Sequence, residues 1–361
     1  MKSITLAQLG CGYWGPNLVR NFGRLPNARL KWVVDADPAR RAYVEENFPK
    51  VQTSGDWKAV LEDPEVDAVI IATAASTHFQ FVKSALLAKK HVFVEKPLAT
   101  SSIEADELVA LAHHMERTLM VGHTFLYNPA VRYLKGILSR GDLGSLYYIY
   151  SHRLNLGQVR SDVNVWWNLA PHDVSILLYL MDGELPVSVS AHGADYIQDR
   201  VEDVAFVTLT WADKLIANIQ VSWLDPAKVR RMTVVGTKKM VIYDDVIDQK
   251  ITILDKGVDR VPVAGEKMDY DDASYKIQHR KGDVWQPQIP AEEPLHVEAR
   301  HFVDCIINKR VPLTGPAHAR DVVAVLEAGD QALKSGKRVP VKSVASGPQV
   351  FQVPTRIRSI A

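Results

Sequence analysis

The sequence contains few cysteines: Cys11 and Cys305 are the only two among its 361 residues. Two cysteines cannot form the disulfide framework of a small secreted domain, and a bridge from Cys11 would obstruct a glycine-rich turn. No apolar run approaches the roughly 20 residues that a membrane-spanning helix needs. The first residues show no apolar segment typical of a secretion signal. We therefore expect a cytoplasmic chain with no membrane partner.

The sequence also lacks a charge excess, low-complexity segments and internal repeats. Its 43 basic residues balance 42 acidic ones, for a net charge of +1. This balance gives no reason to expect binding to nucleic acid or to an anionic membrane surface. Apolar residues at 47% and charged residues at 24% are ordinary for a globular protein, and the length suffices for two domains.

A glycine-rich segment near the N-terminus gives the first functional signal. The apolar run Ile4 to Leu9 predicts a buried strand, which leads into the pattern Gly10-x-Gly12-x-x-Gly15. In dinucleotide-binding folds the first glycine permits a tight turn and the second lets backbone approach a pyrophosphate. The third lets the following helix, here Pro16 to Gly23, pack closely on the strand. That helix would direct its N–H groups and positive dipole end toward the phosphates.

An acidic residue follows where ribose binding requires one. The expected strand Leu30 to Val34 ends at Asp35, twenty residues past Gly15. A carboxylate at this place accepts hydrogen bonds from ribose hydroxyls, and Asp37 adds a second negative charge nearby. Both charges favour NAD over NADP, which carries a 2′-phosphate.

Strand and helix signals alternate up to about residue 122, which predicts a doubly wound parallel sheet. Ser101 and Glu104 have the spacing of a capping box. Further strands are expected at Val66 to Ala72, His91 to Val94 and Leu119 to His123, and helices from after Asp35 through Phe48, at Asp56 to Leu61, Thr77 to Leu87 and Ser101 to Met115.

After residue 122 the pattern changes to short strands with tight turns, which predicts an α+β domain over residues 123–340 with a mostly antiparallel sheet, one face covered by helices. Gly257 to Gln288 is expected to be a long loop, and residues 341–361 a tail that follows the surface or reaches a partner subunit. The expected helices are 129–139, 170–180, 294–308 and 316–335, and the expected strands are 146–153, 187–194, 203–211, 215–223, 230–235, 240–244 and 249–254.

These segments resemble the glucose-fructose oxidoreductase / inositol dehydrogenase / rhizopine catabolism (Gfo/Idh/MocA) family along essentially the whole chain. The resemblance implies a Rossmann domain over residues 1–122, a second domain with an open-faced sheet, NAD(P)-dependent redox chemistry at a sugar or cyclitol carbinol, and a homodimer or homotetramer. It is carried by Gly10 to Gly15, Asp35 to Pro38, Ile71 to Thr73 with His78, Val94 to Leu98, and Asn168 to Asp173. The cofactor contacts that it implies are Gly10, Gly12, Tyr13, Trp14, Gly15, Asp35, Asp37, Thr73, His78, Glu95, Lys96 and Pro97.

Two positions depart from the family pattern. Ala74 stands where many members have proline, and Asn168 stands where many have an acid four residues before the catalytic histidine. The second departure leaves open whether a third catalytic group exists. Within the family, the segments Arg160 to Asn164, Trp166 to Asp173 and Pro290 to His296 resemble the branch that oxidises nucleotide-activated sugars, the UDP-N-acetylglucosamine 3-dehydrogenases among them.

Hydride transfer from an alcohol needs one group that takes the hydroxyl proton and another that stabilises the developing alkoxide. Lys96 follows a parallel strand at its carboxyl end, beside the crevice where such sheets bind ligands. His172, which we expect at a helix start, is the expected base, although the reverse assignment is also open. No set of His, Cys and carboxylate residues has metal-ligand spacing. The candidate substrate contacts are Lys96, Asn128, Arg160, Asn168 and His172.

Plainer alternatives exist for these residues and for the function. A lysine at a strand end is often a solvated charge, His78 could be structural, and Arg160 could form a surface salt bridge instead of binding a substrate phosphate. The leading hypothesis is NAD-dependent oxidation of a secondary hydroxyl, C3, of a sugar such as UDP-N-acetylglucosamine. The alternatives are a dehydrogenase of a free sugar or cyclitol, a glycosidase with tightly held NAD, and a non-catalytic NAD- and sugar-sensing regulator. The presence of both Lys96 and His172 favours an enzyme, since a sensor needs no proton-transfer pair.

Overall fold

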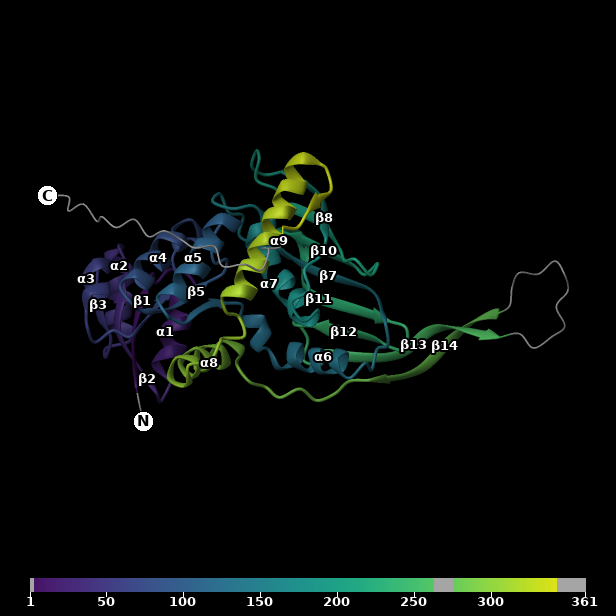
Figure 1. Cartoon of the computed structure of the whole chain (residues 1–361), viewed down its shortest axis with the longest axis horizontal. Helices are drawn as coiled ribbons and strands as arrows, with labels where there is room; N and C mark the ends of the chain where they lie inside the picture. Colours follow the sequence, from purple (N-terminus) through teal and green to yellow (C-terminus); the bar gives the residue numbers. More distant parts are fainter. Residues whose placement is uncertain (1–2, 263–274, 343–361) are drawn as a thin grey trace. The chain divides into compact units, whose positions relative to one another are not determined.

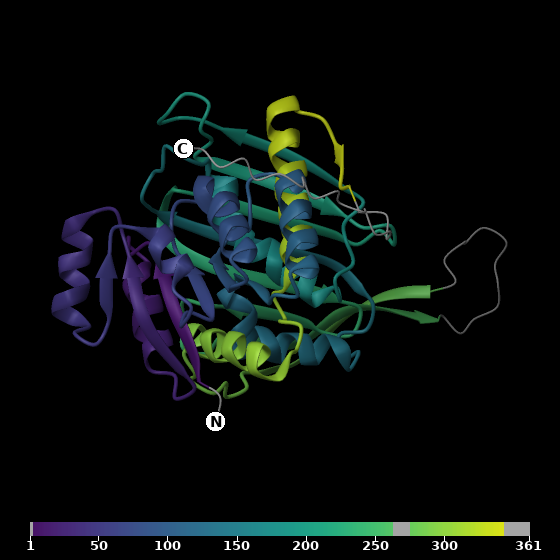
Figure 2. The same ribbon diagram turned by 60° about the vertical axis from the view of Figure 1, so that its left-hand side comes forward.

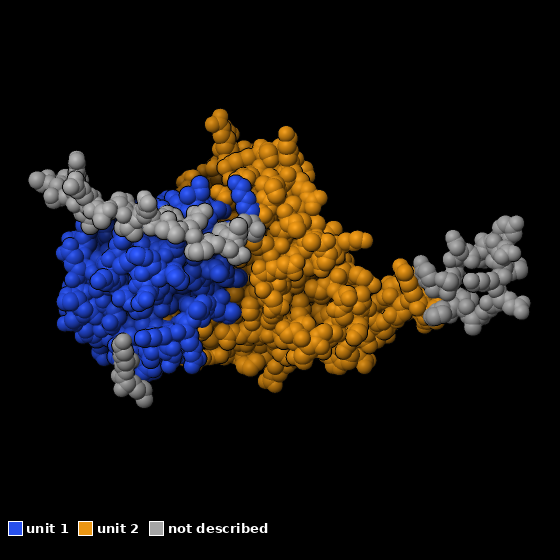
Figure 3. All heavy atoms as spheres, in the orientation of Figure 1, with its two compact units in different colours: residues 1–121, 303–320, 342–361 blue, residues 122–302, 321–341 orange. Residues whose placement is uncertain are grey.

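The computed structural model of the chain describes residues 3–262 and 275–342 (Figure 1). These residues form two compact units, which Figure 3 distinguishes by colour. The first unit comprises residues 3–121, 303–320 and 342, and the second comprises 122–262, 275–302 and 321–341. The division therefore passes through helices α8 (Pro294–Asn308) and α9 (Pro316–Ser335), whereas the expected domains were each continuous in sequence.

The first unit contains a parallel sheet with the strand order β3-β2-β1-β4-β5-β6. Successive connections run outward in one direction from β1 and in the other from β4. Because such crossovers are right-handed, this reversal places helices on both faces and opens a crevice at the carboxyl ends of β1 and β4. The predicted doubly wound sheet is confirmed. Its strands are β1 (Ile4–Leu9), β2 (Ala28–Val34), β3 (Gln52–Ser54), β4 (Ala68–Ile71), β5 (His91–Glu95) and β6 (Leu119–Gly122).

Side-chain caps define where three helices of the first unit begin, namely α2, α3 and α5. Asp37 accepts from the N–H of Ala39 at 2.8 Å, and Ser101 accepts from the N–H of Glu104 at 3.3 Å. The predicted capping box is only half present, because the Glu104 carboxylate accepts from the N–H of Thr100 at 3.4 Å, one residue before Ser101. The helices are α1 (Gly15–Gly23), α2 (Pro38–Asn47), α3 (Trp57–Glu62), α4 (His78–Leu87) and α5 (Ser102–His114), with a 3₁₀ turn η1 (Ala75–Thr77) before α4.

The second unit contains a mostly antiparallel sheet, as predicted; the described residues give it nine strands in the order β14-β13-β12-β11-β7-β10-β9-β8-β15. The neighbours β7 and β10 are parallel. Figure 2 shows the long hairpin of β13 and β14 continuing past the ends of the other strands. The strands are β7 (Leu146–Leu156), β8 (Ser188–Ala194), β9 (Val204–Thr210), β10 (Ile216–Ser222), β11 (Leu224–Gly236), β12 (Met240–Asp244), β13 (Ile251–Pro262), β14 (Tyr275–Trp285) and β15 (Val339–Pro340).

One face of this sheet is covered by helices and the other is open. The helix α7 (Val165–Leu180) packs against β7, β9 and β10, and α6 (Pro129–Ser139) packs against β12. Along β7 the residues Ile149 and Arg153 are buried, whereas Tyr148 on the opposite face is 46% exposed. This alternation is what a half-covered sheet requires. In the part of the chain that the structure describes, no helix is both long and apolar enough to cross a membrane.

Helix α7 begins earlier than expected, at Val165 instead of Ala170. The side chain of Asn164 accepts from the N–H of Trp167 at 3.1 Å, which caps the helix at that point. Pro171 therefore lies inside the helix, where it has no N–H to donate to the preceding turn. His172 consequently lies in the interior of α7, and its expected place at the helix start is wrong.

The expected long loop Gly257 to Gln288 is also wrong over residues 257–262 and 275–285, whereas residues 286–288 lie outside the strands. Strands β13 and β14 pair in antiparallel fashion from Ile253 with Trp285 to Pro262 with Tyr275. The many charges of this segment are compatible with a strand at the sheet edge, because most of its side chains are exposed and can pair with one another. Arg280, for example, donates to Asp255 at 2.9 Å and also contacts Asp259. Residues 263–274 of the expected loop, and residues 343–361 of the expected tail, lie outside the described residues.

Candidate active site

The glycine turn after β1 has the geometry of a phosphate-binding loop. Gly10 has a φ of +89°, and a Cβ atom there would lie 2.6 Å from the carbonyl oxygen of Ala72, so only glycine fits. Its N–H donates to the carbonyl of Val34 at 2.7 Å. A Cβ atom at Gly12, by contrast, would meet no atom of the chain within 4 Å. The chain itself leaves this space open, which fits a loop that a pyrophosphate approaches closely.

Asp35 anchors the same loop from the end of β2. Its Oδ2 accepts from the N–H of Cys11 at 2.7 Å, and its Oδ1 accepts from the N–H of Asp37 at 2.9 Å. A carboxylate offers about four acceptor positions, so Asp35 can still receive ribose hydroxyls. Burial, with the charge of Asp35, raises the pKa of the Cys11 thiol to about 11, which leaves this cysteine unreactive. Asp37, an expected cofactor contact, caps α2 in the structure.

The guanidinium of Arg41 is committed to the backbone beside Asp35. Its Nη1 donates to the carbonyl oxygens of Asp35 at 2.7 Å and of Ala36 at 3.0 Å. Arg41 is thus held by neutral acceptors and is not set aside for a ribose 2′-phosphate. This arrangement agrees with the preference for NAD that the two carboxylates predict.

His78 joins the loops that follow β4 and β5. It is 1% exposed, with Nδ1 2.7 Å from the carbonyl oxygen of Pro97 and Nε2 3.2 Å from that of Thr73. Burial lowers the pKa of His78, so its imidazole is neutral and carries one N–H. With one N–H, the ring can donate to only one of these two carbonyl oxygens. The structure thus brings the expected cofactor residues Thr73, His78 and Pro97 together, with the His78 ring inside the unit.

Glu95 ends β5 and Lys96 follows it. The indole N–H of Trp14 donates to Oε1 of Glu95 at 3.0 Å, which links the glycine loop to the end of β5. Burial raises the pKa of Glu95 to about 7, against the opposing effect of the Lys96 charge. Tyr13, the neighbour of Trp14 in the glycine loop, is 91% exposed.

In the second unit, His172 is part of a row of interacting side chains. Its ring lies against that of Phe125, with 4.9 Å between the centroids, and the Arg153 guanidinium lies over the same Phe125 ring at 4.6 Å. Arg153 is fixed by Asp173, whose Oδ2 accepts from its Nε at 2.6 Å. Asp173 also accepts from Ser151 Oγ at 2.6 Å. Asp173 therefore ties α7 to β7, while Phe125 connects the buried ion pair to His172.

Two expected substrate residues already have partners in the second unit. Asn168, one turn before His172 on α7, accepts from the indole N–H of Trp223 at 3.1 Å. The side chain of Arg160 donates to both oxygens of Asp162, at 2.8 and 2.6 Å. The salt bridge considered as the plainer alternative for Arg160 is therefore present.

The third expected substrate residue, Asn128, caps α6. Its Oδ1 accepts from the N–H of Ala130 at 2.9 Å, and its Nδ2 donates to Tyr243 Oη at 3.3 Å and to Asp245 Oδ1 at 3.1 Å. Both the oxygen and the nitrogen of this buried amide form hydrogen bonds within the second unit. Asn128 therefore has the contacts of a structural residue.

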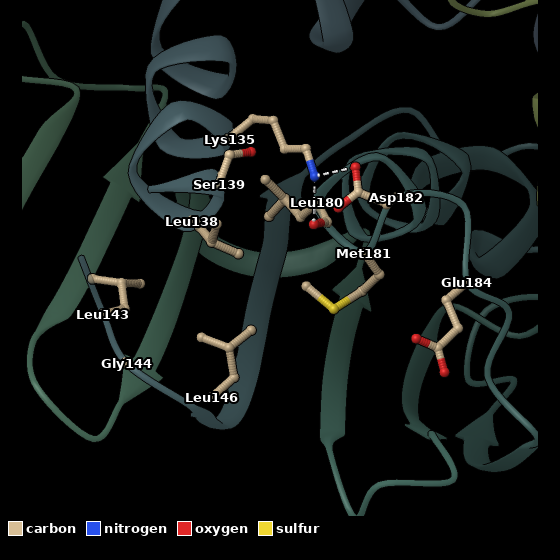
Figure 4. Close-up of a pocket in the computed structure, with 10 residues that line it drawn as sticks. All are labelled: Lys135, Leu138, Ser139, Leu143, Gly144, Leu146, Leu180, Met181, Asp182 and Glu184. Carbon is tan, nitrogen blue, oxygen red and sulfur yellow. Dashed lines mark hydrogen bonds and ion pairs between the residues drawn. The ribbon is translucent and has the colours of Figure 1, made fainter. Parts of the chain in front are cut away.

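A cavity of about 260 Å³ lies in the second unit away from these residues (Figure 4). Lys135 lies at its edge, where Nζ donates to the carbonyl of Leu180 at 3.0 Å and pairs with Asp182 at 2.7 Å. The positive charge of Lys135 therefore lies beside the carboxyl end of α7, where it interacts favourably with the helix dipole. The cavity is lined by Lys135, Leu138, Ser139, Leu143, Gly144, Leu146, Leu180, Met181, Asp182 and Glu184, and the expected site residues are not among them. In the described ranges no group of three or more His, Cys, Asp or Glu residues could hold a metal ion.

Comparisons with known proteins identify the family. Residues 4–123 match the oxidoreductase family with an NAD-binding Rossmann fold, and residues 131–242 match the Gfo/Idh/MocA C-terminal domain. The chain is 32% identical over 313 residues to the UDP-N-acetylglucosamine 3-dehydrogenase of Acidithiobacillus ferrooxidans, which covers 84% of this chain and 92% of that protein. The chain belongs to the Gfo/Idh/MocA family.

Two further relatives of this Gfo/Idh/MocA protein act on a cyclitol, according to their names. The scyllo-inositol 2-dehydrogenase (NAD⁺) of Bacillus subtilis is 26% identical over 352 residues, which is 93% of this chain and 96% of that protein. The crystal structure of scyllo-inositol dehydrogenase from Lactobacillus casei with NAD(H) and scyllo-inositol has a TM-score of 0.76. It covers 95% of this chain and all of that one at 17% identity, which shows the common fold.

The predicted family, fold class and cofactor are thus confirmed: the chain is an oxidoreductase whose first unit is an NAD-binding Rossmann fold. Three residues with contacts in these regions were not predicted from the sequence: Phe125 and Arg153, described above, and Gln8, whose amide donates to the carbonyls of Gly10 and Gly15. The sequence contained a signal for Gln8, because it is a polar residue inside the apolar run Ile4 to Leu9. Phe125 and Arg153 gave none, because their roles depend on contacts with residues distant in sequence.

Proposed function

We propose that this protein is an NAD-dependent dehydrogenase that oxidises a secondary hydroxyl, at C3, of a nucleotide-activated sugar such as UDP-N-acetylglucosamine to the keto sugar. The observation that carries the proposal is the 32% identity to a UDP-N-acetylglucosamine 3-dehydrogenase over 92% of that relative. Lys96 and His172 occur in this chain within the motifs that the sequence analysis assigns to catalysis.

In the proposed reaction, NAD held by the glycine loop and Asp35 would supply the acceptor for the hydride of the carbinol carbon. The Lys96 ammonium donates a hydrogen bond to the substrate oxygen, and this bond strengthens as negative charge develops there. His172 takes the hydroxyl proton on its neutral imidazole. Phe125, held by Arg153 at 4.6 Å, restricts the orientation of the His172 ring. If Lys96 is the base instead, His172 variants should keep the rise of activity with pH.

The other site residues have proposed roles that follow from their contacts. Toward NAD we propose the glycine loop with Tyr13 and Trp14, the carboxylates Asp35 and Asp37, and the group Thr73, His78, Glu95 and Pro97, in which His78 acts by holding the two loops. Toward the sugar we propose Asn168 and Arg160, and we assign Asn128 a positioning role at the start of α6. To bind a phosphate, Arg160 would exchange the two oxygens of the Asp162 carboxylate for two oxygens of the phosphate, which the same N–H donors can reach.

A free sugar or cyclitol is the second candidate substrate. It is favoured by the likeness to a scyllo-inositol 2-dehydrogenase over 93% of this chain and by the pairing of Arg160 with Asp162. The test incubates the purified protein and NAD with UDP-N-acetylglucosamine, N-acetylglucosamine or scyllo-inositol, and follows the absorbance of reduced cofactor. A keto product identified by mass from the UDP-sugar alone supports the first candidate. Turnover of the free compounds alone overturns it, and release of N-acetylglucosamine from the UDP-sugar without net reduced cofactor indicates a glycosidase.

We also propose a homodimer or homotetramer in the reducing cytoplasm, with residues 1–122 and 123–340 as the nucleotide-binding and substrate-binding domains. The exposed Tyr148 and Phe206, each 46% accessible on the open face of the sheet, support association through that face. Light scattering of the purified protein tests this, and Phe206→Asp should shift it toward the monomer. A parent protein that is monomeric at micromolar concentration contradicts it.

A further inference from the structure

Gln8 is a polar residue buried in the middle of the core of the first unit. It lies on β1 between Ala7 and Leu9, and its side chain is completely shielded from solvent. A buried amide is costly unless it forms hydrogen bonds, so its presence in an apolar strand needs a reason.

The amide of Gln8 holds both ends of the glycine loop. Its Nε2 donates to the carbonyl oxygen of Gly10 at 2.9 Å and to that of Gly15 at 3.1 Å. A Cβ atom at Gly15 would lie 3.2 Å from the same Nε2 and 3.1 Å from the Gly10 oxygen, so the close packing of loop and helix occurs on this side chain. In the described part of the chain, Gln8 Oε1 has no hydrogen-bond partner. The contribution of Gln8 therefore comes from the two hydrogen bonds that its Nε2 donates.

These bonds turn two carbonyl groups of the loop inward. The N–H of Gly10 is also bound inside, by Val34, and the N–H of Cys11 is bound by Asp35. With these groups fixed, the carbonyl oxygens of Gly10 and Gly15 are bound to Gln8 and are not presented to an anion that approaches the open space beside Gly12. A loop already in this conformation pays less to bind a ligand than one that must be ordered first.

We propose that Gln8 is a positioning residue for the cofactor pyrophosphate: its amide holds the glycine loop in the NAD-binding conformation and thereby sets the affinity for NAD. The inference rests on NAD binding and is independent of which sugar is oxidised, so it can fail or succeed separately from the proposed substrate.

The main test replaces Gln8 by methionine, which has a similar length and no donor. We expect the dissociation constants of NAD and of ADP-ribose, measured by calorimetry without sugar, to rise by roughly tenfold, because two buried carbonyls lose their donor and the competent loop becomes a minor state. Binding of adenosine, which lacks the pyrophosphate, should change by less than about twofold in ligand-observed NMR. At saturating NAD, turnover should stay near that of the parent, so the loss appears in KM for NAD and not in kcat.

Two further variants separate positioning from general damage. Leu30→Val trims a buried side chain on β2, where Leu30 pairs with Leu6 away from the loop. This control should lower the melting temperature about as much as Gln8→Met does and should leave ADP-ribose binding unchanged. Gln8→Glu places a carboxylate against two carbonyl oxygens, and its ADP-ribose affinity should recover as pH falls and the acid becomes a donor. The proposal is overturned if Gln8→Met binds ADP-ribose within about twofold of the parent, or if adenosine binding weakens equally.

Discussion

Asp35 fixes the glycine loop by accepting from the N–H of Cys11, and in the proposed site its remaining acceptor positions receive the ribose hydroxyls. A 2′-phosphate about 4 Å from this carboxylate would be repelled by roughly 4 kcal/mol per charge pair at an effective dielectric constant near 20. Even after screening, a third of this energy amounts to about tenfold. We therefore predict that kcat/KM for NAD exceeds that for NADP at least about tenfold.

The measurement compares initial rates with the two cofactors, and Asp35→Ser provides the control. In this variant the ratio of kcat/KM for NAD to kcat/KM for NADP should fall toward unity. NAD binding itself also weakens, because the N–H of Cys11 loses its acceptor. Equal efficiency of the parent with both cofactors contradicts the prediction.

Lys96 should act on the transition state more than on bound substrate. We predict that Lys96→Met keeps the fold and the NAD affinity but lowers kcat by roughly a hundredfold or more, as the loss of an oxyanion donor does elsewhere. Steady-state kinetics with an NAD titration checks this. Near-normal turnover in a folded variant would remove Lys96 from the mechanism.

The pH dependence of a His172 variant distinguishes the two assignments of the base. If its neutral imidazole accepts the proton, activity rises with pH on the acid side, and His172→Asn abolishes this rise while cofactor affinity is kept. A His172→Asn enzyme with an unchanged rising limb would assign the base to Lys96.

The raised pKa of Glu95 gives stability a definite pH dependence. Between its ordinary value of 4.5 and its folded value of about 7, the native protein binds more protons at this site than the unfolded chain. The contribution of Glu95 to the free energy of unfolding is therefore largest below about pH 4.5 and is lost as pH rises through 7. Denaturant unfolding of the parent and of Glu95→Gln at several pH values measures it. The parent should lose stability relative to the variant across this window, and a constant difference would refute the assignment.

Sequence and structure agree at residues whose role depends on neighbours along the chain. Gly10 has the positive φ of the tight turn that its place after β1 predicts, and Asp35 directly follows the end of β2, as expected. Phe125 and Arg153 act through contacts with residues distant in sequence, which spacing does not encode. Gln8 bonds to Gly10 and Gly15, which are near in sequence, but the direction of its side chain does not follow from the pattern. Arg160 was open between a ligand and a salt bridge, because the pattern could not show that Asp162 faces it.

At the scale of elements, the junction between α7 and β7 depends on one buried ion pair. The side chains of Arg153 and Asp173 are 6% and 4% exposed. We predict that Asp173→Asn lowers the free energy of unfolding by about 3–5 kcal/mol, since it leaves the guanidinium buried without its counter-charge. Asp162→Asn is the matched control: it breaks the Arg160 pair, whose side chains are 42% and 39% exposed, and should cost at most about 1 kcal/mol. Denaturant unfolding compares the two, and equal losses would contradict the prediction.

Elements with strong amphipathic periodicity were predicted closely, and the bounds of α6, α8 and α9 agree with the expected ranges. Two errors have local causes. Pro171 suits the first turn of a helix, but the cap at Asn164 begins α7 earlier. Gly257 to Gln288 is polar because its strands lie at an exposed sheet edge, so the usual apolar signal of a strand is weak there.

At the scale of the whole molecule, the first unit is assembled from separated segments. The N–H of Val121 donates to the carbonyl of Thr314 at 3.0 Å, and Arg320 pairs with Asp106 at 2.9 Å. A fragment of residues 1–122 loses both bonds and the cover of buried Val303 and Ala319. We predict that it melts well below the full chain in thermal unfolding with and without NAD. A fragment with the melting temperature of the full protein would show that residues 303–320 are dispensable.

This interleaving sets an order for synthesis in the cell. The nucleotide-binding unit begins at the N-terminus, yet its last segment leaves the ribosome only after residues 122–302 have been made, roughly 10–40 s later at about 5–20 residues per second. During that interval the nascent first unit lacks part of its cover. Its folding therefore cannot finish before residues 122–302 have been made, and a chain stalled within them carries a first unit that still lacks the contacts of Thr314 and Arg320.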